Sequence, residues 1–235
     1  MLRRRLLAGL PLSTLTMVGA QAATGDLAVT CDTTLAPVLR KAGARYEALT
    51  GVRVHVFATP PGLIVPQLVR DIQNDIVVTQ TTILDQAVQA GVVATLPRAQ
   101  WRNPIVIAGR RGATIISGSF AAADASPASD MDTATVLSRI GIMTGQVQGA
   151  LDTDEVAFLL RTGAAQAGLL HMTDVRAHDA LSVIRPVPPD IQPALRYAAS
   201  VSRLAQRPDP QGFVRFLASS DGGDVLTEGG LEITA

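Results

Sequence analysis

The fold is decided by residues 27–35, which read LAVTCDTTL. Leu27–Cys31 has the apolar and β-branched composition of a buried strand. An acidic residue and two threonines follow, and Thr34 stands just before a helical run over Leu35–Leu49 that Gly51 closes. This order predicts a strand, a short polar loop, and a helix with Thr34 as its N-cap.

Outward from this stretch, short β-rich runs alternate with helical runs. The further strands that we expect are Val52–Phe57, Ile76–Thr79, Pro104–Ala108, Ile140–Thr144, Ala167–His171 and Ala194–Val201. The further helices that we expect are Leu63–Asp71, Ile83–Gln89, Met131–Arg139, Asp154–Arg161, Gln211–Ser219 and Gly223–Glu228. Apolar strands that alternate with helices indicate α/β architecture with parallel sheets covered by helices.

Two interruptions divide this alternation. The segment 110–129 is rich in small residues and lacks periodicity, and 186–193 is rich in proline. We therefore expect two α/β lobes, with one inserted into the other and crossings near Ala108 and Pro189–Pro193. On this division, residues 23–108 and 194–235 form the first lobe, and residues 109–193 form the second.

Residues 1–22 have the three parts of a secretory signal peptide. Three arginines at positions 3–5 are followed by an apolar stretch over Leu6–Val18 and by the small-x-small sequence Ala20-Gln21-Ala22. No later stretch reaches the roughly 18 apolar residues that a membrane-spanning helix requires. We expect a mature protein that is exported across the cytoplasmic membrane and is periplasmic.

The composition excludes several classes of partner. Removing residues 1–22 leaves 17 basic against 20 acidic side chains, a net charge of −3, which argues against nucleic acid and anionic membranes. The single cysteine, Cys31, rules out an internal disulfide, and we interpret it as a buried strand residue. Aromatic residues are scarce, which disfavours sugars because sugar sites stack the ring on aromatic faces.

The sequence lacks the common catalytic and metal-binding motifs. Gly-x-Ser-x-Gly, the phosphate-binding loop, His-Glu-x-x-His and cysteine pairs are all missing. His55, His171 and His178 are scattered along the chain. The acidic run Asp152–Glu155 could bind a cation, but a helix start rich in carboxylates is the commoner explanation. We predict a binding protein that is not an enzyme and has no cofactor or metal site.

Hydroxyl side chains recur where predicted strands lead into helices. Ligands of open parallel sheets bind at these carboxyl ends, where hydroxyls and free helix N–H groups form an anion site without formal positive charge. The alternative is that each threonine is only an N-cap, which is the commoner role for any single one. The loops concerned are 32–34, 59–61, 80–82, 124–129, 152–153 and 171–174.

These segments resemble the molybdate-binding family of periplasmic proteins. The first strand and loop are similar to the family's Ser-bearing first loop, and Ala167–Asp174 resembles its motif Ala-Gly-apolar-apolar-Tyr-x-(Ser/Thr)-Asp. Asn74–Thr79, Asn103–Ala108 and Phe213–Gly229 resemble further segments of the family in the same order. The resemblance covers nearly the whole mature chain.

The resemblance implies a type II periplasmic-binding-protein fold with a ligand cleft between the lobes. It implies the solute receptor of an ABC importer, a monomer that binds a tetrahedral oxyanion such as molybdate or tungstate and delivers it to a permease. The family's ligand-binding positions fall here on Thr34, Thr59, Ala128, Thr153 and His171.

Three features depart from the family's pattern. Asp32 puts a carboxylate in the first ligand loop, Pro60-Pro61 remove backbone donors, and His171 stands in place of tyrosine. A carboxylate repels a dianion. Two alternatives therefore stay open: the same fold binding another solute or a cation through Asp32 and His171, or an enzyme that uses these two residues as a general acid–base pair.

Overall fold

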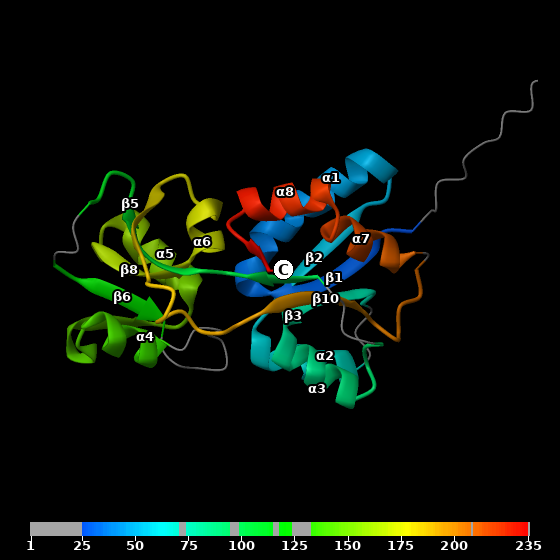
Figure 1. Cartoon of the computed structure of the whole chain (residues 1–235), viewed down its shortest axis with the longest axis horizontal. Helices are drawn as coiled ribbons and strands as arrows, with labels where there is room; N and C mark the ends of the chain where they lie inside the picture. Colours follow the sequence, from blue (N-terminus) through cyan, green and yellow to red (C-terminus); the bar gives the residue numbers. More distant parts are fainter. Residues whose placement is uncertain are drawn as a thin grey trace, which may run out of the picture.

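The computed structural model describes residues 25–70, 74–94, 99–114, 118–123, 133–207 and 209–234. Within these ranges the strands form two sheets, of six and five strands. Figure 1 shows the two sheets side by side, each with helices on both of its faces. The predicted two-lobed α/β fold is confirmed. The signal peptide predicted at residues 1–22 lies outside the described residues.

The first lobe is built on the six-stranded sheet, in which β1 pairs in parallel with both β2 and β3. In spatial order its strands are β11 (Glu232–Thr234), β4 (Gln100–Arg102), β10 (Tyr197–Val201), β3 (Ile76–Gln80), β1 (Leu27–Asp32) and β2 (Val54–Thr59). Every residue of β1 is buried, including Cys31, as the sequence predicted. β10 runs antiparallel to β3 and β4, so the chain returns into the middle of this sheet.

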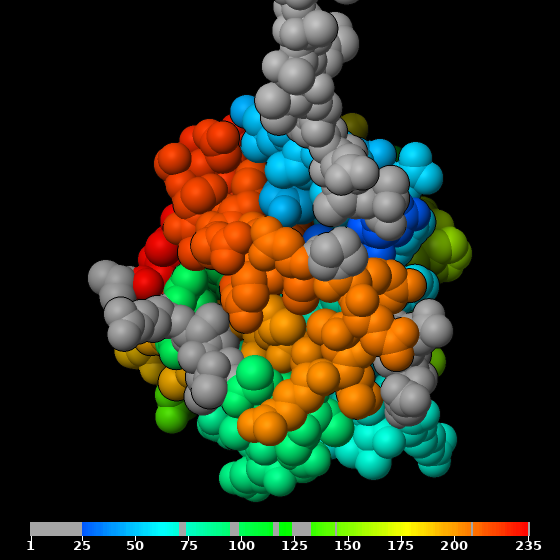
Figure 2. Space-filling view, turned by 90° about the vertical axis from the view of Figure 1, so that its right-hand side faces the viewer, coloured from blue at the N-terminus to red at the C-terminus, as the bar shows by residue number. Residues whose placement is uncertain are grey.

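Helices cover both faces of the first sheet. They are α1 (Ala36–Thr50), α7 (Pro210–Leu217) and α8 (Ser220–Glu228) on one face, and α2 (Pro61–Val69) and α3 (Thr81–Gln89) on the other. α1 ends at Gly51, whose left-handed φ of 77° lets its N–H reach the Glu47 carbonyl at 2.8 Å. Seen from the end of this lobe, the chain around residues 195–207 lies between α1 and the pair α2 and α3 (Figure 2).

The second lobe is built on the five-stranded sheet. In spatial order its strands are β7 (Val147–Ala150), β6 (Phe120–Ala123), β8 (Ala167–His171), β5 (Ile105–Arg110) and β9 (Leu181–Pro186). α5 (Thr153–Thr162) and α6 (Met172–Ala177) pack on one face, and α4 (Thr133–Ile140) on the other. The predicted strand Ile140–Thr144 is wrong, because Ile140 and Ile142 pack against the core of this face while the strand begins at Val147.

Two segments connect the lobes. The first is Asn103–Pro104, between β4 and β5, and the second is 187–196, between β9 and β10. The predicted boundary after Ala108 falls inside β5, which pairs with β8 and β9, so that crossing lies earlier in the chain. The apolar run Pro104–Ala108 gives no sign of which sheet it joins, because both sheets contain buried apolar strands.

Gln192 ties the two crossings together. Its side-chain amide accepts a hydrogen bond from the Ile105 N–H at 2.9 Å and donates to the Ile105 carbonyl at 2.7 Å. It also donates to the Val187 carbonyl at 2.9 Å. The connections between the lobes are therefore linked to each other at the start of β5.

Candidate functional site

The carboxyl ends of the parallel strands in both lobes lie at the crossings. Ile105, the first residue of β5, pairs with His171 at the carboxyl end of β8. Tyr197, the first residue of β10, pairs with Gln80 at the carboxyl end of β3. The first crossing ends at Ile105 and the second at Tyr197, so each crossing enters its next sheet beside the carboxyl ends of that sheet's parallel strands. The carboxyl edges of the two sheets therefore face each other. We call this region the interlobe face.

The lobes touch at this face. The 3-10 turn η1 (Thr33–Leu35) and α1 of the first lobe contact α6 of the second. Gly230, just after α8, has a φ of +102° and packs against Met172, where an added Cβ would lie 2.7 Å from Cγ and 2.9 Å from the carbonyl carbon. Glycine at this position therefore permits the close approach of the two lobes.

Asp32, Thr34 and Thr59 lie at the edge of the first lobe, and all three are buried. Asp32 ends β1 and is in register with Thr59, which ends β2. Thr34 lies inside η1, and α1 takes Leu35 as its N-cap residue, so the prediction that Thr34 caps this helix is wrong. The helix starts through a 3-10 turn because the Ala36 N–H already bonds the Thr33 carbonyl.

The two carboxyl-end hydroxyls of this edge are engaged within the lobe. The Thr79 hydroxyl donates to Asp32 Oδ1 at 2.5 Å. The Thr59 hydroxyl donates to Gln67 Oε1 at 3.1 Å. Pro60 and Pro61 form the N-cap and first residue of α2, so the backbone N–H groups of these two positions are missing. This edge is therefore richer in acceptors than its threonine content indicates.

Thr153 and His171 lie at the edge of the second lobe, and both are buried. Thr153 begins α5, whose N-cap Asp152 accepts a hydrogen bond from the Glu155 N–H at 2.9 Å. Glu155 in turn accepts from the Leu151 N–H at 2.7 Å, so these carboxylates support the helix start. Ala128, the remaining residue of the predicted site, lies outside the described residues.

His171 is tied to the first crossing. Its ring Nδ1 lies 3.3 Å from the Asn103 carbonyl oxygen, and its backbone N–H donates to Asp174 Oδ2 at 3.1 Å. The Asn103 side chain donates to the Thr173 hydroxyl at 2.8 Å and accepts from the Thr173 N–H at 3.3 Å. One residue of the crossing thus orients both His171 and the start of α6.

The structure adds three residues that the sequence analysis did not select: Thr79, Asn103 and Gln192. Thr79 could be found only from the register between β1 and β3, which the sequence does not reveal. Asn103 carries a local signal, since Asn-Pro dipeptides favour turns. Gln192 has no such signal, because its two bonds to Ile105 cross 87 positions of sequence.

Other chemistry is sparse. Among the described residues, no group of three or more His, Cys, Asp or Glu side chains could hold a metal ion. Burial, and secondarily the charge of Asp32, raises the pKa of the Cys31 thiol far above its usual range. The thiol therefore stays protonated and is no nucleophile.

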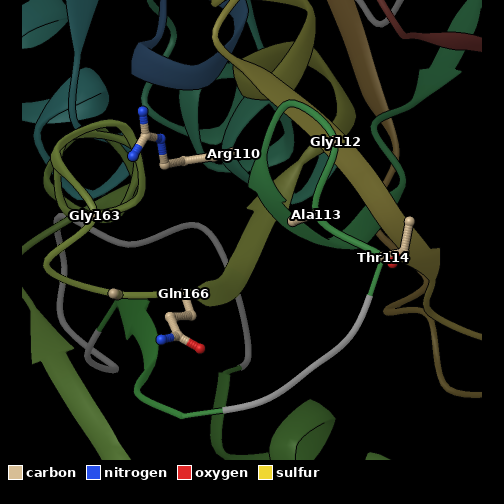
Figure 3. Close-up of a pocket in the computed structure, with 7 residues that line it drawn as sticks. Arg110, Gly112, Ala113, Thr114, Gly163 and Gln166 are labelled. Carbon is tan, nitrogen blue, oxygen red and sulfur yellow. The ribbon is translucent and has the colours of Figure 1, made fainter.

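A cavity of about 480 Å³ lies at the opposite end of the second lobe. It is lined by residues of the β5 end and the α5–β8 turn, among them Arg110, Thr114, Gly163 and Gln166. Figure 3 shows the side chains of Arg110 and Gln166 pointing away from each other. Because these polar groups do not converge, the interlobe face remains the candidate site.

Two α/β lobes with facing carboxyl edges and two crossings form the architecture that two-lobed solute-binding proteins share. A family model for bacterial extracellular solute-binding proteins matches residues 27–232. The chain belongs to this family. In the described part of the chain, no helix is long and apolar enough to cross a membrane.

Solved structures support the fold. The periplasmic molybdate-binding protein of Azotobacter vinelandii superposes with a TM-score of 0.71 at 12% identity, over 89% of this chain and 100% of its own. A substrate-binding domain assigned to a molybdenum ABC transporter of Clostridium difficile gives 0.72 at 15% identity, over 89% and 99%. At such identities the likeness concerns the fold alone.

One sequence relative carries an enzyme's name. It is called aconitate isomerase, from Pseudomonas sp, and is 24% identical over 249 aligned positions. The alignment covers 97% of this chain and 90% of the relative. A sequence relative of this chain therefore carries the name of an enzyme.

Proposed function

We propose that this protein is the periplasmic solute receptor of an ABC importer and binds a small anion at the interlobe face. The observation that supports it most directly is the meeting of two carboxyl edges, each with buried hydroxyls next to helix starts. Since Thr34, Thr153 and His171 are buried, a ligand reaches them only when the lobes separate. Binding then favours the closed arrangement, which a membrane permease would recognise.

Thr34 and Thr153 supply the proposed anion contacts from the two lobes. Each lies in the first turn of a helical segment, where uncompensated N–H groups and the helix dipole favour negative charge. The resemblance implies molybdate or tungstate as ligand, and these are the first probes to use. In this proposal the receptor acts as a monomer and requires no cofactor.

Isothermal titration calorimetry of the full mature chain tests this proposal. Thr34→Ala should weaken anion binding by about 1.5–3 kcal/mol, roughly ten- to more than a hundredfold in Kd, because a hydrogen bond to a charged group is lost. Thr34→Ser, which retains the hydroxyl, is the matched control and should be mild. An affinity for Thr34→Ala within twofold of the unmodified protein would count against Thr34 as a ligand.

A second candidate function is isomerisation of an unsaturated carboxylate, favoured by the relative named aconitate isomerase. Asp32 and His171, from opposite lobes, would act as base and acid. One removes a proton from carbon, the double bond shifts by one position, and the other group returns a proton at the far end of the allylic system. The step conserves atoms and electrons and requires no cofactor.

Proton NMR of aconitate incubated with the protein in D₂O separates the two functions. An isomerase converts one isomer into the other, and Asp32→Asn should abolish the conversion. A receptor leaves the isomer ratio unchanged even when its resonances broaden on binding. Unchanged aconitate at high protein concentration would remove the enzymatic candidate.

A further inference from the structure

Asp32 faces the α2 and α3 side of the first sheet, at its carboxyl end. Side chains alternate along a strand, and the neighbouring Cys31 packs in the core under α1, α7 and α8. Asp32 and Thr79 therefore share the opposite side, where the Thr79 hydroxyl donates to Asp32 Oδ1. A hydroxyl has one hydrogen, so Thr79 offers a ligand only its lone pairs.

Thr59 repeats this pattern on the other side of Asp32. It is in register with Asp32, and its hydrogen is directed to Gln67 Oε1. The start of α2 adds few donors, because Pro60 and Pro61 have no N–H and the Leu63 N–H already bonds the Pro60 carbonyl at 2.9 Å. Around Asp32, the edge of the first lobe thus presents acceptors.

We propose that the ligand is an anion that carries its own hydrogen-bond donor and places this donor on Asp32. The inference rests on the proposed function and narrows its ligand class. Hydrogenphosphate and phosphate monoanions have such a donor, as do hydroxycarboxylates. Molybdate and sulfate are fully ionised at neutral pH and carry none, so they cannot donate a hydrogen bond to Asp32, and its carboxylate repels them. A site built to accept a ligand hydroxyl rejects the analogue that lacks it.

Calorimetric titration of the full mature chain with matched probes tests the inference. One arm compares citrate with tricarballylate and malate with succinate, which differ by one hydroxyl. A second arm compares phosphate near pH 6 with sulfate, and molybdate serves as the fully ionised reference of the family. At least one donor-bearing member should bind tenfold or more tightly than its partner, and the arm in which this occurs identifies the source of the donor.

Asp32→Asn provides the decisive variant, since it keeps the shape and replaces one acceptor by a donor. It should lower affinity for the preferred donor-bearing probe at least tenfold and raise affinity for sulfate or molybdate. Asp75→Asn is the matched control, because Asp75 is also buried in the first lobe but bonds the Ala28 N–H at the other end of the sheet. It should leave the order of preference unchanged.

The outcomes separate this inference from the function on which it rests. Binding of molybdate or sulfate at least as tight as that of every donor-bearing probe would overturn the inference and leave the receptor function standing. So would an unchanged preference in folded Asp32→Asn. Absence of binding by all these anions would overturn the proposed function itself. If Asp32→Asn does not fold, the comparison of probes on the unmodified protein still decides.

Discussion

The two edges that meet at the interlobe face are held in different ways. In the first lobe, Asp32 and Thr59 bond partners within their own lobe, Thr79 and Gln67. In the second lobe, His171 and the start of α6 are held by Asn103, a residue of the crossing. The hydrogen bonds of the first edge do not depend on how far apart the lobes are. The orientation of His171 and of the start of α6 at the second edge depends on the crossing.

Removing the Asn103 side chain, which links the first crossing to the edge of the second lobe, should have the largest effect on the free energy of unfolding. Asn103→Ala leaves the buried Thr173 hydroxyl and N–H without their side-chain partner, at a cost of about 2–4 kcal/mol of unfolding free energy. Urea unfolding followed by circular dichroism measures it through the shift in midpoint. Asn103→Asp keeps the acceptor and loses the donor, so its loss should be smaller. If Asn103→Ala unfolds at the same urea concentration as the unmodified protein, Asn103 does not stabilise the edge of the second lobe.

The start of α5 gives a smaller effect that is confined to the second lobe. Asp152→Ala removes the side chain that accepts from the Glu155 N–H and should cost about 0.5–2 kcal/mol. Asp154→Ala is the control, because Asp154 is exposed in the same first turn and does not cap the helix. Thermal unfolding of both variants checks the difference, and equal losses would contradict the assignment of the cap.

The smallest effect concerns pH. Burial, followed by the charge of Arg161, lowers the pKa of His178, just beyond α6, from its ordinary value of 6.5. The unfolded chain then binds the proton more readily, so this group destabilises the fold as pH falls below 6.5 toward the lowered value. As the pH falls from 8 to 5, the free energy of unfolding of His178→Gln should therefore rise relative to that of the unmodified protein. Parallel melting curves across this range test it, and a constant difference would refute it.

Sequence patterns predicted the first half of the first lobe well and parts of the second lobe poorly. β1, α1 and β3 combine buried apolar strands with an amphipathic helix and a glycine stop, which are local signals. β6 was missed because its sequence, Phe-Ala-Ala-Ala, has little β propensity and is a strand only by burial between β7 and β8. Tertiary contacts determine such strands.

The candidate site was predictable as a set of strand ends but not as a hydrogen-bond network. Asp32, Thr34, Thr59, Thr153 and His171 do lie at the edges that face each other, and their roles toward a ligand remain predictions. What the sequence could not provide is the direction of each hydroxyl hydrogen. That direction depends on Thr79 and Gln67, which only strand register and helix placement bring into contact.

The position of β10 has a consequence for how the chain folds. Tyr197 pairs with Gln80, so the middle of the first sheet is completed only after the entire second lobe has emerged. The second lobe spans one continuous segment and can form earlier. Long-range pairing of this kind is slow, and β3 and β4 expose unpaired edges until β10 arrives. We expect this half-built first lobe to be the species that aggregates or binds chaperones.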